Sequence, residues 1–397
     1  MITKVGSRKA SPRSLLFRVI MLLIVVDACL GISVAFYELG LKTDVTFVKS
    51  LADIEVGPIN PAAWPDLLGT DGQLDEMQVA ETLSLTLGTP PNVREYEREA
   101  VRIEWLGEEK LSTHKRVKLT YGVRDGEPVP AYLLVPNSGG TRPGPAVLAL
   151  HQTTDAGKDE VVGIRGNPDF AYGKELVERG YVVLAPDAIT AGERISSAGP
   201  FNTDSFYTVY PDWSALGKML QDHQRGIDVL ETLATVDPQR IGVIGHSLGG
   251  QNALFLAAFD QRVKVVVVNC AYERIETDEG RERWSRTFNF IYTPHLREYV
   301  RPGAERRVPW DFQHLLALIE PRPLFQSFGL YDCTWSHPRT PAQIHAALHE
   351  LYGGVGKGEL LHTEFFSGGH GFPVEVRARA YEFLDRFLMT PAVEVEQ

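Results

Sequence analysis

The pattern G-x-S-x-G occurs at Gly245–Gly249, between an apolar segment and a helix-forming one. Residues 241–244 have the apolar character of a buried parallel strand, and residues 252–258 can form a helix. A strand, a sharp turn and a helix, in this order, expose the central serine as a nucleophile. The two glycines leave room in a turn where side chains would collide. The motif therefore predicts covalent catalysis by Ser247.

A serine hydroxyl is a poor nucleophile at neutral pH, so catalysis requires a histidine to accept its proton and a carboxylate to orient that histidine. In an open parallel sheet these groups converge at the carboxyl ends of the strands. Asp332 closely follows the apolar segment 323–329, and His370 lies at the tip of a glycine-bounded loop after the segment 360–366. We therefore predict a triad of Ser247, Asp332 and His370, whose order along the chain is the one this architecture uses.

The negative charge that develops on the attacked carbonyl oxygen requires preorganised N–H donors. We expect one donor to be the backbone amide of Leu248, which follows the nucleophile at the start of a helix. The second donor is expected in the loop after the apolar segment 146–150, where Thr153 is preferred over Gln152. This chemistry requires no cofactor and no metal, and we predict neither.

Several other polar residues are less favoured candidates for catalysis or metal binding. Asp311 is a less favoured acid because it lies in an insertion and not at a strand end. His223 lies on the apolar face of a predicted helix and His151 lies in a loop, so both are interpreted as structural. His345 and His349 have the spacing of metal ligands but lack a third ligand and the glutamate of H-E-x-x-H, so we predict a surface helix there.

From about residue 101 onward, strand-like segments alternate with helix-like ones, which predicts the α/β class with a mostly parallel eight-stranded sheet and helices on both faces. The segments 36–100 and 101–392 are interpreted as an N-terminal extension, with a helix at 78–87, and one catalytic domain. The first two strands are expected to form an antiparallel pair. The predicted strands are 117–121, 131–135, 146–150, 181–185, 241–244, 263–268, 323–329 and 360–366.

Four segments of the chain resemble the α/β-hydrolase superfamily, and within it the serine hydrolases similar to dienelactone hydrolase and acetyl xylan esterase. They are L-A-L-H-Q-T at 148–153, V-D-P-Q-R-I-G-V-I-G-H-S-L-G-G at 236–250, the strand-end Asp332 and G-G-H-G-F at 368–372. The resemblance covers about residues 100–390 and implies ester hydrolysis through an acyl-enzyme. Dienelactone hydrolase itself uses a cysteine nucleophile, so its substrate is not implied. The H-Q-T loop lacks the H-G-G-G of many lipases and esterases, so the second oxyanion donor is left open.

Residues 271–310 form an insertion after a predicted strand that is too long for a simple crossover. Its aromatic side chains alternate with arginines, which suits either a cap over a pocket for a sugar acid or a solvated surface. The expected substrate is a small-molecule or carbohydrate ester, and its identity stays open. A serine peptidase of the same fold and a non-catalytic binding protein are the alternatives.

The chain carries a net charge of −11, from 40 basic and 51 acidic residues, which argues against nucleic acid as a partner. Five basic residues precede an apolar stretch at 19–36, so residues 1–35 resemble an export signal. Asp27 interrupts that stretch and fits a signal poorly. A retained membrane anchor and a cytosolic protein that starts later, for instance at Met21, are the alternatives. A membrane is a partner only if this segment is retained.

Three cysteines do not make a disulfide framework. Cys270 and Cys333 are expected near the carboxyl ends of neighbouring strands, where a disulfide bond between them is geometrically possible. Two buried thiols are the favoured interpretation.

Overall fold

The computed structural model describes residues 76–89, 100–122, 126–137, 142–278, 280–285, 292–301, 303–304, 308–335 and 339–389. The predicted export or anchor segment and most of the predicted N-terminal extension lie outside these ranges. The helix expected at 78–87 is confirmed as α3 (Glu76–Leu87). Within the described ranges, none of the helices combines the length and the apolar character that a membrane crossing needs.

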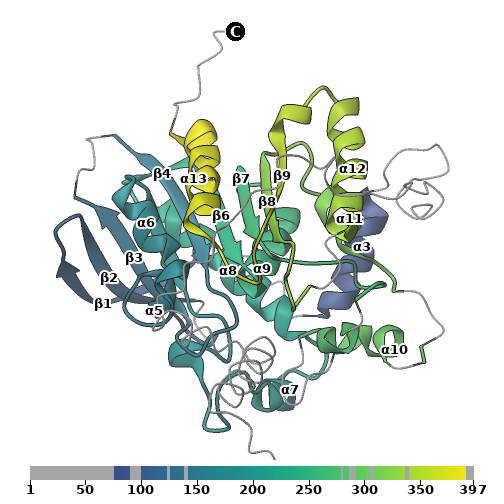
Figure 1. Cartoon of the computed structure of the whole chain (residues 1–397). Coiled ribbons are helices and arrows are strands. Elements are labelled where there is room, and N and C mark those ends of the chain that lie inside the picture. Colours follow the sequence, from purple (N-terminus) through teal and green to yellow (C-terminus); the bar gives the residue numbers. More distant parts are fainter. Residues whose placement is uncertain are drawn as a thin grey trace, which may run out of the picture. The chain divides into compact units, whose positions relative to one another are not determined.

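A nine-stranded mixed sheet with the order β1-β2-β3-β5-β4-β6-β7-β8-β9 forms the centre of the described chain (Figure 1). The first three strands and β5 pair antiparallel, and every later pair is parallel. The strands are β1 (Arg102–Lys110), β2 (His114–Gly122), β3 (Val129–Pro136), β4 (Gly144–Leu150), β5 (Val182–Pro186), β6 (Val236–His246), β7 (Val265–Asn269), β8 (Leu324–Gly329) and β9 (Leu361–Phe366).

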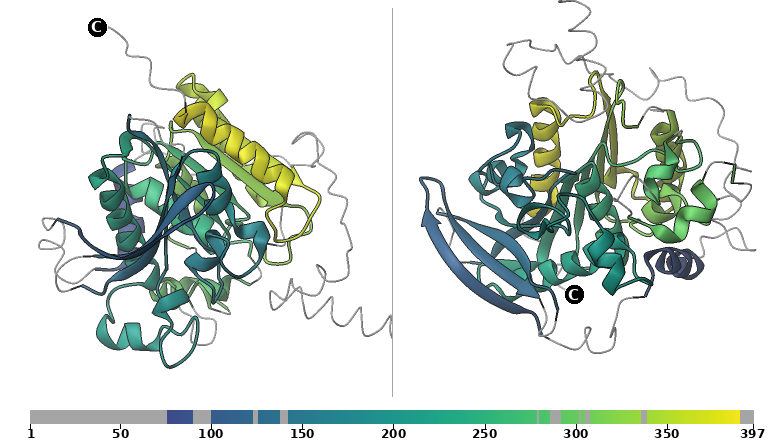
Figure 2. Two further views of the ribbon diagram at one scale, coloured as in Figure 1. Left: turned by 90° about the vertical axis from the view of Figure 1, so that its left-hand side faces the viewer. Right: turned by 90° about the horizontal axis from the view of Figure 1, so that it is seen from below.

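The mostly parallel α/β sheet is confirmed, but it contains one strand more than the eight expected. The extra strand is β1, which pairs with β2 at one edge of the sheet (Figure 2). All but one of its residues are exposed, and its sequence R-I-E-W-L-G-E-E-K is mostly polar or charged. Because no face of β1 is buried, its sequence has no alternating apolar pattern that would indicate a strand.

Helices cover both faces of the sheet. The helices α6 (Tyr172–Glu178) and α13 (Val374–Leu388) lie on one face, and α8 (Ala215–Thr232) and α9 (Leu248–Phe259) lie on the other (Figures 1 and 2). The remaining helices are α5 (Lys158–Val161), α7 (Asp204–Val209), α10 (Arg297–Val300), α11 (Phe312–Ala317), α12 (Arg339–Gly354) and the short 3₁₀ turns η3 (Pro168–Phe170), η4 (Gly192–Arg194), η5 (Arg281–Trp284), η6 (Pro294–Leu296) and η7 (Gly358–Leu360).

The middle strands are apolar because helices bury both of their faces. Every residue of β5, β7 and β8 is buried, as expected for parallel strands between two helical layers. Glycines bring the helices close to the sheet on each side. A Cβ at Gly242 of β6 would lie 2.8 Å from the side chain of Leu388 in α13, and one at Gly226 of α8 would lie 3.1 Å from that of Leu148 in β4.

The carboxyl ends of β6, β7, β8 and β9 meet at one edge of the sheet. His246 pairs with Asn269, Asn269 pairs with Ser327, and the last residues of β8 and β9 pair with each other. Because these four strands are parallel and in register, the loops that follow them begin side by side. Two of those loops contain Asp332 and His370, and the turn after β6 contains Ser247.

Candidate active site

Ser247 lies in the sharp turn between β6 and α9, with a backbone φ of 52° that residues other than glycine rarely adopt. A Cβ at Gly249 would lie 2.0 Å from the carbonyl oxygen of Leu150. A Cβ at Gly245 would lie 2.2 Å from the backbone of Gly249. Both contacts are with backbone atoms that cannot rotate away. The prediction that the two glycines leave room in this turn is therefore confirmed.

Ser247, His370 and Asp332 are in direct contact. His370 Nε2 lies 2.8 Å from Ser247 Oγ, and His370 Nδ1 lies 2.7 Å from Asp332 Oδ2. The carboxylate is an acceptor only, so Nδ1–H donates to it and Nε2 is left to accept the serine proton. The side chain of Asp332 is 2 % exposed and that of His370 is 19 % exposed. The imidazole therefore reaches solvent, whereas the carboxylate beneath it does not.

The second carboxylate oxygen of Asp332 is held by the backbone of its own loop. Oδ1 accepts hydrogen bonds from the amides of Thr334, at 2.8 Å, and Trp335, at 3.1 Å. The indole N–H of Trp335 in turn donates to the carbonyl oxygen of Cys270, at 2.7 Å. Both oxygens thus have fixed donors, which set the orientation of the carboxylate toward His370.

Asn269, the last residue of β7, joins the serine turn to the histidine loop. Its side-chain amide donates to the carbonyl oxygen of Gly371, at 2.7 Å. Its backbone carbonyl oxygen accepts from the backbone amide of Ser247, at 2.9 Å. The hydroxyl of Ser327 donates to Asn269 Oδ1, at 2.7 Å. Asn269 was not among the site residues predicted from the sequence. The signal that the sequence offers is its place at the end of the buried strand β7, which follows the strand β6 that leads into Ser247.

His246, next to Ser247, is buried beneath the candidate site. Its ring stacks on Phe170 with 4.6 Å between centroids and lies 4.8 Å from the ring of His370. The Asn269 amide also lies 2.7 Å from His246 Nδ1, to which it donates. Burial, together with the nearby His370, lowers the pKa of His246 well below its usual range. His246 therefore adds no positive charge beside His370.

The loop after β4 packs directly on the serine turn, as the contact between Gly249 and Leu150 requires. The side chain of Gln152 donates to Glu160, at 3.0 Å, and Thr153 is exposed. Leu248 is the first residue of α9. The roles of Leu248, Thr153 and Gln152 as oxyanion donors stay predictions. The side chain of Leu248 lies in a small apolar cluster with Ala188, Ile189, Ala215, Met219 and Tyr292, which we call the Leu248 cluster.

A buried ion pair connects the loop after β4 to the loop after β5. Lys158 Nζ lies 2.7 Å from Asp187 Oδ2, and both side chains are almost fully buried. The amides of Lys158 and Glu193 also donate to the Asp187 carboxylate, at 2.8 and 3.0 Å. His151 Nε2 accepts from the amide of Ala188, at 2.9 Å. His151 thus contributes to loop structure.

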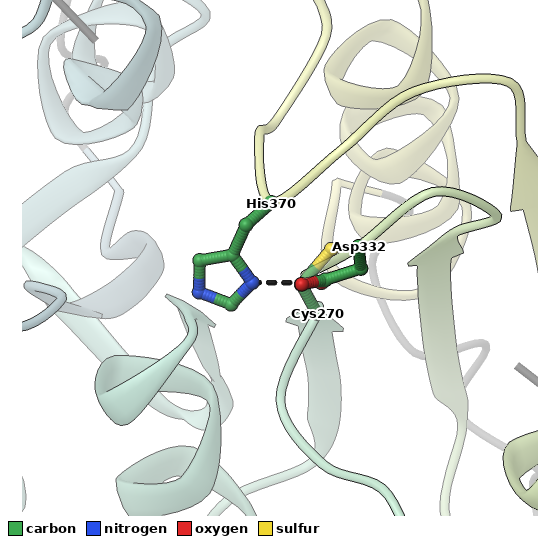
Figure 3. A group of neighbouring side chains, drawn as sticks. All are labelled: Cys270, Asp332 and His370. Carbon is green, nitrogen blue, oxygen red and sulfur yellow. Dashed lines mark hydrogen bonds and ion pairs between the residues drawn. The ribbon is translucent and has the colours of Figure 1, made fainter. Parts of the chain in front are cut away.

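The other polar candidates occupy structural positions. Asp311 caps α11 and accepts hydrogen bonds from the amides of Ile275 and Phe312, at 2.9 and 2.8 Å. His223 is buried on α8, where burial lowers its pKa to about 3. His345 is buried on α12. Of the described residues, the only group of three that could ligate a metal is Cys270, Asp332 and His370 (Figure 3).

The described part of the 271–310 insertion places its two tryptophans in the core. Trp284 packs on Phe312 and Trp335, and Trp310 packs on Phe312. Of its arginines, Arg297 and Arg301 are exposed at the surface, where a solvated face is the simpler interpretation. Arg286, Arg306 and Arg307 lie outside the described residues. The insertion reaches the Leu248 cluster through Tyr292.

Cys270 and Cys333 are not disulfide-bonded in the structure. Cys270 is buried at the end of β7, as expected. The expectation that Cys333 is also buried was wrong. Cys333 is exposed because it lies four residues beyond the end of β8, in the loop that contains Asp332.

Comparison with known proteins gives the same fold and indicates a family. Residues 131–356 match the profile of the family described as "Glucuronyl esterase, fungi", a range that includes Ser247 and Asp332 and ends before His370. The "Putative hydrolase YtaP" of Bacillus subtilis is 29 % identical over 311 residues, which cover 76 % of this chain and 96 % of that protein. A "4-O-methyl-glucuronoyl methylesterase" of Cerrena unicolor is 26 % identical over 49 % of this chain and 44 % of its own length.

The chain thus spans about half the length of the curated methylesterases but nearly all of YtaP. Among solved structures, a "Glucuronoyl Esterase from Solibacter usitatus" superposes with a TM-score of 0.62 at 18 % identity, over 80 % of this chain and 96 % of that one. This likeness shows that the fold is the expected α/β-hydrolase fold.

Proposed function

Since the chain belongs to the glucuronyl esterase family and is thus a carboxylic ester hydrolase, we propose that it cleaves esters of uronic acids with Ser247 as the nucleophile. One observation carries the catalytic part of this proposal. A single imidazole, that of His370, lies within hydrogen-bond distance of both a strained turn serine and a buried carboxylate. This is the arrangement that makes a serine hydroxyl reactive.

The reaction proceeds in two halves. His370 Nε2 removes the proton from Ser247 as Oγ attacks the ester carbonyl, and Asp332 stabilises the imidazolium. The amide of Leu248 and that of Thr153, or alternatively Gln152, stabilise the oxyanion. The imidazolium then gives its proton to the leaving alcohol. A water molecule, deprotonated by the same imidazole, releases the acid from the serine.

Two features of the site support an ester of a sugar acid with a small alcohol. The Leu248 cluster, whose members are buried, lies beside the nucleophile and makes this side of the site apolar, which suits a small alkyl group such as a methyl. Tyr331, next to Asp332, is 74 % exposed, and a ring so exposed is available to a sugar. The names of the relatives point to the same substrate class.

The proposal is tested with purified chain and three substrates: methyl glucuronate, p-nitrophenyl acetate and an aminoacyl amide. We expect the highest kcat/KM for the uronate ester, and labelling of Ser247 by a fluorophosphonate. Ser247→Ala is expected to lower kcat by about 10⁵–10⁶-fold and to abolish labelling, with folding intact. Preferred cleavage of the amide would indicate a peptidase. Absence of both turnover and labelling would indicate a binding protein.

We also propose that the enzyme acts outside the cytoplasm, from the basic and apolar pattern of residues 1–36. Expression of the full chain followed by cell fractionation tests this. A chain recovered from the exported fraction and starting near Phe36 is the expected result. A full-length chain in the cytosol would contradict it.

A further inference from the structure

A buried cysteine lies beside the hydrogen-bonded pair of Asp332 and His370. The Sγ atom of Cys270, an oxygen of Asp332 and a ring nitrogen of His370 all lie within 4.8 Å of one another (Figure 3). Cys270 is buried at the end of β7, and its backbone φ of 46° lies in the left-handed region. The three side chains come from the ends of three neighbouring strands, β7, β8 and β9. They converge from fixed positions, as the ligands of a metal site do.

We propose that Cys270, Asp332 and His370 form a binding site for a soft divalent cation such as Zn²⁺, and that the bound cation inhibits the enzyme. Thiolate, imidazole and carboxylate are the side chains that bind Zn²⁺, and the thiolate disfavours Mg²⁺ and Ca²⁺. A tetrahedral site needs its ligand atoms about 3–4 Å apart. His370 Nδ1 and Asp332 Oδ2 are 2.7 Å apart and all three ligand atoms lie within 4.8 Å of one another, so displacements of about 1 Å are needed to reach this geometry. The cation enters from the side of His370, the one ligand with an exposed edge.

Binding changes the protonation of two ligands. Without metal, Cys270 is a buried thiol whose Sγ–H donates to the carbonyl oxygen of Gly371, at 3.7 Å. The cation displaces that proton to solvent and leaves a thiolate. The cation also takes the place of the proton on His370 Nδ1, and that proton moves to Nε2. The dication, thiolate and carboxylate together are then neutral.

Inhibition follows from the position of the second proton. In the unbound site, Nε2 accepts a hydrogen bond from Ser247 Oγ, at 2.8 Å. With the cation on Nδ1, Nε2 carries a proton and can only donate. The imidazole can no longer accept the proton of Ser247. The cation thus inactivates the nucleophile without occupying the place of the substrate.

Binding is measured without turnover, on the Ser247→Ala variant of the full chain. We expect competition with a chromophoric chelator to show one Zn²⁺ bound per chain, and Co²⁺ to give a thiolate-to-metal charge-transfer band. Cys270→Ser in the same background is expected to abolish the band and weaken Zn²⁺ binding at least tenfold. No bound metal, or an unchanged affinity after Cys270→Ser, would overturn the proposal. Because these readouts need no catalysis, they fail independently of the proposed function.

Inhibition is measured on the active enzyme with p-nitrophenyl acetate, as the Zn²⁺ concentration that halves each variant's own metal-free rate. Cys270→Ser is expected to raise this concentration at least tenfold. The matched control is Cys333→Ser, which changes the other described cysteine, exposed in the same region. This substitution is expected to leave the inhibitory Zn²⁺ concentration unchanged. Mg²⁺ and Ca²⁺ are expected not to inhibit. Equal Zn²⁺ sensitivity of wild type and Cys270→Ser would contradict the assigned site.

Discussion

Two buried aspartates, Asp332 and Asp311, differ in what their oxygens contact. One carboxylate oxygen of Asp332 accepts a hydrogen bond from His370, and the other accepts from two backbone amides. The carboxylate oxygens of Asp311 accept hydrogen bonds from the backbone amides of Ile275, Glu276 and Phe312, and Asp311 caps α11. Burial raises the pKa of Asp311 to about 6. The first carboxylate is in contact with an imidazole, and the second stabilises the insertion.

We expect Asp332→Asn to lower kcat by about 10⁴-fold with folding intact, because an amide side chain no longer selects the tautomer in which Nε2 is free to accept a proton. The measurement is steady-state kinetics with circular dichroism as the check on folding. Asp311→Asn is the matched control, for which we expect kcat within a few-fold of wild type and a lower Tm. Equal losses of kcat in the two variants would contradict the assignment.

Asn269 positions the histidine loop, and we expect Asn269→Ala to lower kcat by about 10–100-fold with little change in KM. The reason is that the variant loses the hydrogen bond to Gly371, and small displacements of a catalytic base cost rates of this size. The control is Asn137→Ala, which removes an exposed asparagine that also donates to backbone carbonyl oxygens, those of Leu111 and Ser112. An unchanged kcat in Asn269→Ala would show that the loop is held by other contacts.

At the scale of elements, the sequence allowed the prediction of every strand with a buried face. The runs at 146–150 and 263–268 have the apolar character that burial between two helical layers requires, and both are strands. The exposed β1 has no such pattern. The predictability of the candidate site residues differs in the same way, because Ser247, Asp332 and His370 follow strands and are of residue types that commonly act in catalysis. Asn269 is an ordinary strand residue in the sequence, and only the register of β7 with β6 shows its contacts.

The turn between β6 and α9 depends on the absence of a side chain at Gly249. We expect Gly249→Ala to destabilise the chain by about 2–3 kcal/mol and to lower kcat, because the new Cβ would meet the Leu150 carbonyl and displace β4 or α9. Chemical denaturation measures the free energy of unfolding. The control is Gly353→Ala in α12, where a Cβ meets nothing within 4 Å and helix propensity predicts a gain of up to about 1 kcal/mol. Similar effects of the two substitutions would contradict this explanation.

At the scale of the whole molecule, buried neutral histidines make stability depend on pH. Burial lowers the pKa of His345 from 6.5 to about 4 and that of His223 to about 3. Between these values and pH 6.5 the unfolded chain binds more protons than the folded chain. The contribution of these two histidines to the free energy of unfolding is therefore complete above pH 6.5 and is lost as the pH falls toward 4.

For His345 alone we expect a loss of about 2 kcal/mol in unfolding free energy between pH 7 and pH 5. The measurement is urea denaturation at both pH values in wild type and in His345→Gln, whose pH dependence is expected to be weaker by about that amount. His349→Gln changes an exposed histidine one helical turn away, whose charge also lowers the pKa of His345, and is expected to weaken the pH dependence by less than His345→Gln does. If the unfolding free energy of His345→Gln changed with pH as much as that of wild type, His345 would not contribute to the pH dependence.

The partner of Ser247 lies 123 residues further along the chain, beyond the last strand of the sheet. A nascent polypeptide on the ribosome can complete the turn between β6 and α9 long before His370 is synthesised. By the proposed mechanism, the Ser247 hydroxyl has no base until then and is as unreactive as that of any surface serine. Reactivity toward a fluorophosphonate is thus expected only after synthesis and folding are complete. A chain that terminates anywhere before the loop after β9 is expected not to react with this probe.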